Sequence, residues 1–273
     1  MPTPTPRPSE ALYDHLAKSN ADRHSLAQRQ TWVIQDWTRP TVSSGIYVRQ
    51  FASAAGDSAS KYVNAITLGA SPVASNYLVM GVNNYNYGGL TSPSPTGWTV
   101  LGESCGDNFY WFGRLVESGD GLTWGPYTYF TGPYSAEGGI AGGIWELVNQ
   151  SASPLGYPWG NFTVYPPEYT VGIELGSYGA TVEAGDLPLV MALSTAYASG
   201  VPPSPITLTR ADSLPVTPRG TQESPTATYP GIFAFGDSDT LPASSSAIFT
   251  ATVPSSPPVN QTEISVCTFH AGA

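Results

Sequence analysis

The 273-residue sequence has few cysteines, no long apolar run and little positive charge. Cys105 and Cys267 are its two cysteines, and neither belongs to a CxxC or Cys/His cluster, which argues against a disulfide framework and a zinc site. No segment approaches the roughly 18 consecutive apolar residues that a membrane-spanning helix requires, and the N-terminus lacks the apolar stretch of a signal peptide. We therefore expect buried thiols, no membrane span and synthesis in the cytoplasm.

Positive charge is scarcest after residue 61. Residues 1–61 contain seven Lys or Arg and five Asp or Glu, a net charge of +2, whereas residues 62–273 contain three and fifteen, a net charge of −12. Because binding to phosphate backbones requires clustered Lys and Arg, this larger region is poorly suited to nucleic acid. We expect no nucleic-acid partner.

Turn-forming and aromatic residues are abundant, with 29 Gly, 26 Pro and 16 Tyr. From Tyr62 onward, short apolar segments such as YLVMGV, FYWFGRLVE and LPLVMALSTAY recur at intervals of roughly ten to fifteen residues, separated by Gly, Pro, Asn and Ser turns. This spacing is typical of β-sandwiches and jelly rolls. The sequence predicts an all-β fold: a two-layer jelly-roll-like β-sandwich with an N-terminal arm of extended chain and short helix.

The predicted arm spans residues 1–61, and the predicted sandwich spans residues 62–273. MPTPTPRP can only be extended, one or two short helices fit between Ser9 and Gln30, and SGIYVRQFA is expected to be extended. The sandwich divides into two similar halves, about 62–150 and 160–273. The segment LVM at 78–80 recurs at 189–191, and FYWFG ending at 113 resembles IFAFG ending at 236. We expect sheets that mix strands from both halves.

Catalytic patterns are weak. FAFGDSDTL resembles the nucleophile block of GDSL-type esterases, but Ser238 lies near the end of the chain, and no Asp-x-x-His pair follows it. Glu146, Glu168 and Glu174 lie in or beside strand-like segments without the spacing of a glycosidase pair, and we expect them on solvated strand faces. No metal or nucleotide motif is present, so we predict no cofactor and no enzyme activity.

Aromatic residues on predicted loops are the strongest candidates for binding. Tyr and Trp on loops provide rigid contact area that suits sugars or protein partners, although packing in the core or against neighbouring copies explains them equally well. The candidate binding residues are Tyr85, Tyr87, Trp124, Tyr127, Tyr157 and Trp159. Gly97 and Trp98 are expected to be structural, because Gly97 permits a positive φ and Trp98 then covers one end of the sandwich.

A family resemblance rests on three consecutive segments. The strand LVMGV at 78–82, the turn SPTGWTVLGE with its Pro95, Gly97 and Trp98, and the aromatic strand FYWFGRLVE follow one another. This series resembles a jelly-roll or lectin-like module that is common in tailed bacteriophages and their actinobacterial hosts, where it occurs in minor tail proteins, fibres and virion decorations. The second half has Pro205-Ile206 in place of the Gly-Trp pair, so the resemblance there is weaker.

The resemblance implies a non-enzymatic virion structural protein, of the minor tail or fibre type, that takes part in host attachment. A head decoration or head-fibre protein is the alternative, and a cell-wall glycan hydrolase is the alternative from another class. The implied partners are other virion proteins, bound through the arm, and host cell-wall polysaccharide. The implied location is the virion, assembled in the host cytoplasm, and the implied assembly state is a homo-oligomer.

Overall fold

The computed structural model describes residues 45–57, 62–84, 95–104, 108–128, 139–150, 158–164, 169–175, 182–196, 205–212, 214–224, 231–242, 247–254 and 259–272. These residues form 17 β-strands and no helix, and all their pairings are antiparallel, so the predicted all-β class is confirmed. The helices expected between Ser9 and Gln30 lie outside the described residues, as does Cys105.

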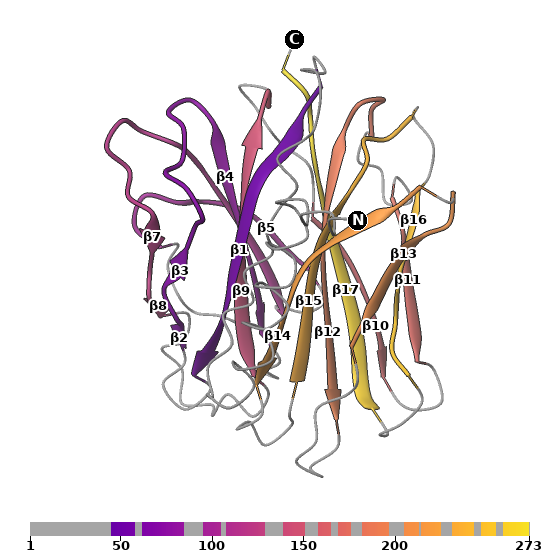
Figure 1. Ribbon diagram of the computed structural model, residues 1–273. Helices are drawn as coiled ribbons and strands as arrows, with labels where there is room; N and C mark the ends of the chain where they lie inside the picture. The colour runs from indigo at the N-terminus through magenta and orange to yellow at the C-terminus, as the bar shows by residue number, and fades with distance from the viewer. Residues whose placement is uncertain are drawn as a thin grey trace, which may run out of the picture. The chain divides into compact units, whose positions relative to one another are not determined.

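The first half of the chain forms two sheets (Figure 1). The seven-stranded sheet has the order β5-β6-β4-β9-β1-β2-β8, with β1 (Tyr47–Asp57), β2 (Tyr62–Val63), β4 (Tyr77–Asn84), β5 (Thr99–Ser104), β6 (Phe109–Leu115), β8 (Tyr127–Thr128) and β9 (Ile140–Val148). The two-stranded sheet pairs β3 (Ile66–Thr67) with β7 (Thr123–Trp124).

The second half also forms two sheets. The five-stranded sheet has the order β10-β17-β12-β15-β14, with β10 (Pro158–Val164), β12 (Leu187–Ala196), β14 (Val216–Ser224), β15 (Gly231–Ser238) and β17 (Val259–Phe269). The three-stranded sheet has the order β11-β16-β13, with β11 (Thr170–Glu174), β13 (Thr207–Arg210) and β16 (Ile248–Thr252). Each sheet takes its strands from one half of the chain, so the expectation of mixed sheets is wrong.

The two halves have the same connectivity. In the first half β4 lies between β6 and β9, with β5 and β1 outside them, and in the second half β12 lies between β15 and β17, with β14 and β10 outside them. The strands that occupy equivalent places also occur in the same order along the chain. The likeness that the sequence indicated between the halves is therefore present in their strand order.

The repeated LVM segment marks equivalent strands but not equivalent faces. Leu78 and Met80 on β4 point toward the β3–β7 sheet, whereas Leu189 and Met191 on β12 point toward the other half of the chain. A shift of one residue turns every side chain of a strand to the opposite face. The structural correspondence between β4 and β12 is thus offset by an odd number of residues from the sequence match.

β1 belongs to the seven-stranded sheet, although it lies within the range predicted as an arm. It pairs with β9 and β2, and the register shifts between Val48 and Gln50. This bulge explains the imperfect alternation of the segment, because the extra residue allows Val48 and Phe51 to lie on the same face despite their odd spacing. Residues 47–57 of the predicted arm therefore form a strand inside the seven-stranded sheet.

The seven-stranded and five-stranded sheets pack face to face across a central, mostly apolar layer. β1 lies beside β14, and β5 lies beside β10. Large aromatic side chains from the two sheets meet there, with 5.9 Å between the ring centroids of Trp145 and Phe235 and 5.7 Å between those of Phe51 and Phe235. Each large sheet is also covered on its outer face, one by β3 and β7 and the other by β11, β13 and β16 (Figure 1).

Close packing in the central layer depends on Gly143. A Cβ atom at this position would lie 2.7 Å from Cε2 of Phe51 and 2.9 Å from Cδ1 of Phe235, and both rings are held by their neighbours. Gly143→Ala is expected to lower the free energy of unfolding by about 1–3 kcal/mol, as overpacked cores do, in a urea titration. Gly121→Ala is the control, because its Cβ would meet nothing within 4 Å. Equal effects of the two substitutions would contradict this account of the layer.

Candidate functional site

Three of the aromatic residues singled out in the sequence converge at one end of the first half. Trp98 donates a hydrogen bond from Nε1 to the Tyr127 hydroxyl over 3.1 Å. Its ring meets Trp124 edge-on, with 5.7 Å between centroids and an interplanar angle of 80°, and meets Tyr127 at 6.4 Å and 84°. These edge-to-face arrangements are the preferred ones for aromatic pairs, so the cluster is well packed.

An arginine completes this aromatic cluster. The guanidinium carbon of Arg114 lies 4.8 Å from the centroid of the Trp124 ring, and its Nη2 donates to both carboxylate oxygens of Asp120 over 2.9 Å. Gly97 has a φ of +82°, and a Cβ there would lie 3.0 Å from Nη1 of Arg114. Glycine therefore provides both the turn conformation and the room for the arginine.

The two tryptophan rings of this cluster offer little surface to a ligand. Trp98 is 6% exposed and Trp124 is 7% exposed, and both pack in the core between the seven-stranded sheet and the β3–β7 sheet. Tyr127 is half-buried, and burial raises the pKa of its phenol. Trp98 and Trp124 are thus mostly buried, and Tyr127 keeps part of its surface open to solvent. The binding roles expected for Trp124 and Tyr127 and the covering role expected for Trp98 stay predictions.

The other aromatic candidates are not brought into this cluster. Trp159 lies on β10, where it pairs with Val266 of β17, so it belongs to the other half of the chain. Tyr85, Tyr87 and Tyr157 lie outside the described residues. Their expected role in binding stays a prediction.

The residues of the esterase-like segment FAFGDSDTL make structural contacts. The Ser238 hydroxyl accepts a hydrogen bond from Nη1 of Arg210 over 2.8 Å and donates to the Pro215 carbonyl. Asp237 forms an ion pair with Arg219. His270 has an aspartate partner, Asp186, that the sequence did not indicate, at 2.6 Å from Nδ1 to Oδ1. Within the described residues, no hydrogen bond joins this histidine to the serine, so no nucleophile–base pair is formed.

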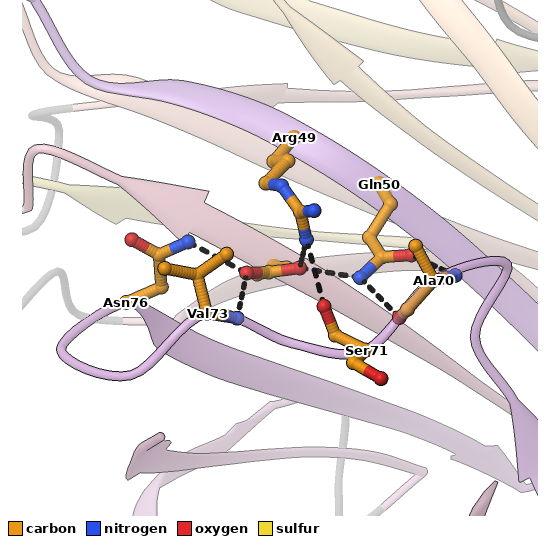
Figure 2. Close-up of polar contacts among 7 residues, drawn as sticks. Arg49, Gln50, Ala70, Ser71, Val73 and Asn76 are labelled. Carbon is orange, nitrogen blue, oxygen red and sulfur yellow. Dashed lines mark hydrogen bonds and ion pairs between the residues drawn. The ribbon is translucent and has the colours of Figure 1, made fainter. Parts of the chain in front are cut away.

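Glu146 is a buried carboxylate that accepts four hydrogen bonds. It lies on β9, is 0% exposed, and accepts hydrogen bonds from Nη1 of Arg49 at 2.6 Å and from Nε2 of Gln50. Its other oxygen accepts from the Val73 amide at 2.8 Å and from Nδ2 of Asn76 at 2.6 Å. Figure 2 shows these donors converging from β1 and from the loop before β4.

The same donors fasten the loop at 69–76 to β1. Gln50 donates to the Ala70 carbonyl and accepts from the Ala70 amide, at 2.9 and 3.0 Å, and Arg49 donates to the Ser71 carbonyl at 3.2 Å (Figure 2). The bulge in β1 lets two consecutive side chains, Arg49 and Gln50, reach one carboxylate. Glu146 is therefore a structural anchor, and the expectation that it lies on a solvated strand face is wrong.

Comparison with known proteins assigns neither a family nor a function to this chain. No family model, curated protein or solved structure matches this chain. Across the part of the chain that the structure describes, no group of three or more His, Cys, Asp or Glu side chains is placed to hold a metal ion. The same part contains no helix that is long and apolar enough to cross a membrane. The functional argument therefore rests on the residues and their geometry.

Proposed function

We propose that this chain is a non-enzymatic structural protein of a tailed-phage virion, of the minor tail or fibre type, and that it contributes to host attachment. The observation that carries the proposal is the pairing of two similarly connected β units across one apolar layer. Within this body, the buried carboxylates Glu146 and Asp237 are engaged with Arg49 and Arg219 and hold strands and loops together. This construction suits a structural protein that must keep its shape under mechanical force.

The topology supports a jelly roll in each half. Numbered along the chain from β10 to β17, the second half has strands 1-8-3-6-5 in its large sheet and 2-7-4 in its small sheet. An eight-stranded jelly roll has the sheets 1-8-3-6 and 2-7-4-5. The second half differs only in strand 5, which is β14 and joins the large sheet instead of the small one. The first half follows the same plan with β1, β4, β6 and β9 in its large sheet. The resemblance to phage modules implies one two-layer jelly-roll-like sandwich over residues 62–273, whereas this strand order supports one jelly-roll-like unit in each half.

The positions of the acidic side chains weigh against the hydrolase alternative. A glycosidase needs two carboxylates facing a sugar in a cleft, about 5 to 10 Å apart. Glu146 is buried and accepts four hydrogen bonds, while Glu174 lies on the exposed face of β11 in the other half. Neither geometry suits a general acid or a nucleophile, which supports a structural role for both halves.

The position of the protein on the intact phage particle tests the proposal. A density map of the particle is expected to show the paired β units at the tail, where host contact occurs, with residues 1–44 reaching neighbouring virion proteins. Density on the head shell instead would favour the decoration alternative. Absence from the purified particle would contradict both.

Binding to purified host cell walls tests the attachment role. Replacing Tyr85 and Tyr87 with Ser is expected to weaken binding of the assembled protein while changing the free energy of unfolding by less than about 0.5 kcal/mol, because the sequence predicts both on a loop and exposed substitutions rarely change stability. The matched control is Tyr62→Ser on β2, which is expected to lower stability without a specific loss of binding. Release of reducing sugar from the walls would instead support a hydrolase, and equal binding by the Tyr85/Tyr87 variant would exclude these tyrosines from attachment.

A further inference from the structure

The central layer between the two halves is apolar at one end and polar at the other. At the polar end, β6 of the first half faces β17 of the second half. Nε1 of Trp111 donates to the Ser265 hydroxyl at 2.9 Å, and the Ser104 and Ser265 hydroxyls lie 2.7 Å apart. Two residues before Ser265 on the same face of β17 stands Glu263. These contacts form a polar seam between the halves.

Glu263 is fully buried in this seam. Its Oε1 accepts a hydrogen bond from Nδ2 of Asn108, in the first half, at 2.6 Å, and another from Nε2 of Gln261. Its Oε2 has no hydrogen-bond partner among the described residues. The two amide donors occupy one oxygen, so the other oxygen is available to carry a proton.

No charged side chain among the described residues compensates a negative charge on Glu263. The described parts of β4, β10 and β12 carry no acidic or basic side chain. On β6, Arg114 lies at the opposite end and is paired with Asp120. On β17 itself, burial raises the pKa of Cys267, so this thiol stays neutral, and on β5 Glu103 is exposed to water.

The seam holds further unused polar groups. Asn83 lies at the end of β4 beside Phe109 of β6, and Thr195 lies on β12 beside Gln261 of β17. Both side chains are fully buried, and neither the Asn83 amide nor the Thr195 hydroxyl has a hydrogen-bond partner in the described part of the chain. These unpaired polar groups make this end of the layer less stable than the apolar end. A new charge there would therefore open this end to water more readily.

We propose that Glu263 is a proton-sensitive lock between the two halves. Uncharged, it closes the polar end of the central layer through Asn108. When it loses its proton, the resulting carboxylate is buried without a cation, and the contact between β6 and β17 loosens so that water reaches it.

The direction of the pH dependence follows from the environment of Glu263. Burial raises its pKa from 4.5 to about 8, an effect that the two amide hydrogen bonds only partly offset. The folded state therefore holds the proton more tightly than the unfolded state. The stability linked to this proton is complete below the unfolded pKa, falls as the pH rises, and is lost once the pH passes the folded pKa.

Hydrogen exchange across this pH range tests the lock. After correction for the intrinsic exchange rate, amides of β6 and β17 are expected to lose about tenfold or more of their protection between about pH 7 and pH 9.5, while amides of the three-stranded sheet β11-β16-β13 keep theirs. Glu263→Gln, which keeps the shape without the titration, is expected to abolish the loss. Glu103→Gln is the matched control on the neighbouring strand and is expected to behave like the unchanged protein.

Equal loss of protection in the unchanged protein and in Glu263→Gln would overturn the proposal. A second measurement does not depend on the variant folding. Difference infrared spectra of the unchanged protein are expected to show the carbonyl band of a protonated carboxylic acid at neutral pH, and this band is expected to vanish above about pH 8 together with the protection of β6 and β17. Loss of the band without loss of protection, or absence of the band at neutral pH, would also refute the lock.

Discussion

Glu146→Ala is expected to lower the free energy of unfolding by about 3 to 5 kcal/mol, because it removes one partner of a buried ion pair and leaves several donors without an acceptor. Gln50, Asn76 and the Val73 amide would each lose a hydrogen bond. Arg49 is 30% exposed and can turn toward water, which favours the lower end of this range. The loop at 69–76 would lose its attachment to β9.

Chemical denaturation together with hydrogen exchange measures this effect. Amides between residues 69 and 76 are expected to exchange faster in Glu146→Ala even under conditions where the rest of the protein stays folded. Glu117→Ala is the control, since this glutamate is exposed and is expected to change stability by less than about 0.5 kcal/mol. A loss below about 1 kcal/mol in Glu146→Ala would mean that water replaces the carboxylate at little cost.

Trp98→Ala is expected to destabilise the protein by about 3 to 5 kcal/mol, the usual cost of removing a buried tryptophan. The substitution opens a cavity beside Trp124 and removes the hydrogen bond to Tyr127. It also removes the ring that closes the core between the seven-stranded sheet and the β3–β7 sheet. Trp98→Phe is expected to recover part of the loss, because it fills much of the cavity but cannot donate the hydrogen bond.

Thermal and urea unfolding of the Trp98 variants check this prediction. Val100→Ala serves as the control, because Val100 is a large apolar residue on the adjoining strand but is 51% exposed. It is expected to cost less than about 0.5 kcal/mol. If Trp98→Ala and Val100→Ala destabilise equally, Trp98 does not close the core.

The sequence predicted most strands but missed one and misplaced another. Short, nearly continuous apolar segments, such as those of β4, β6 and β12, appear as strands where they were expected. β14 was missed because its sequence VTPRGTQES has little apolar character and contains Pro218, which is tolerated where the register shifts on an edge strand. β1 was assigned to the arm because its bulge breaks the alternation, and only the pairing with β9 shows where it belongs.

The candidate site was less predictable than the fold. Glu146 was expected in water because a glutamate on a strand is usually exposed, yet its neighbours in GGIWELV form a strand that is buried on both faces. A charged residue within such an apolar run was the one feature of the sequence that could have indicated a buried glutamate with a bonding partner. Arg49 and Asn76 gave no signal, since their convergence depends on a bulge and on a loop that lie far apart in the sequence. The burial of Trp98 was easier to predict, because it follows from the chemistry of the turn at Gly97.

The placement of β1 beside β14 and of β5 beside β10 has a consequence for assembly. Since β1 and β10 occupy equivalent places in their halves, as do β5 and β14, the two contacts are counterparts, and the halves meet like the subunits of a two-fold symmetric dimer. In a true dimer this association weakens on dilution, and every substitution appears twice. Here the link between β9 and β10 keeps the pair together at any concentration, and each outer surface accepts substitutions independently of its counterpart.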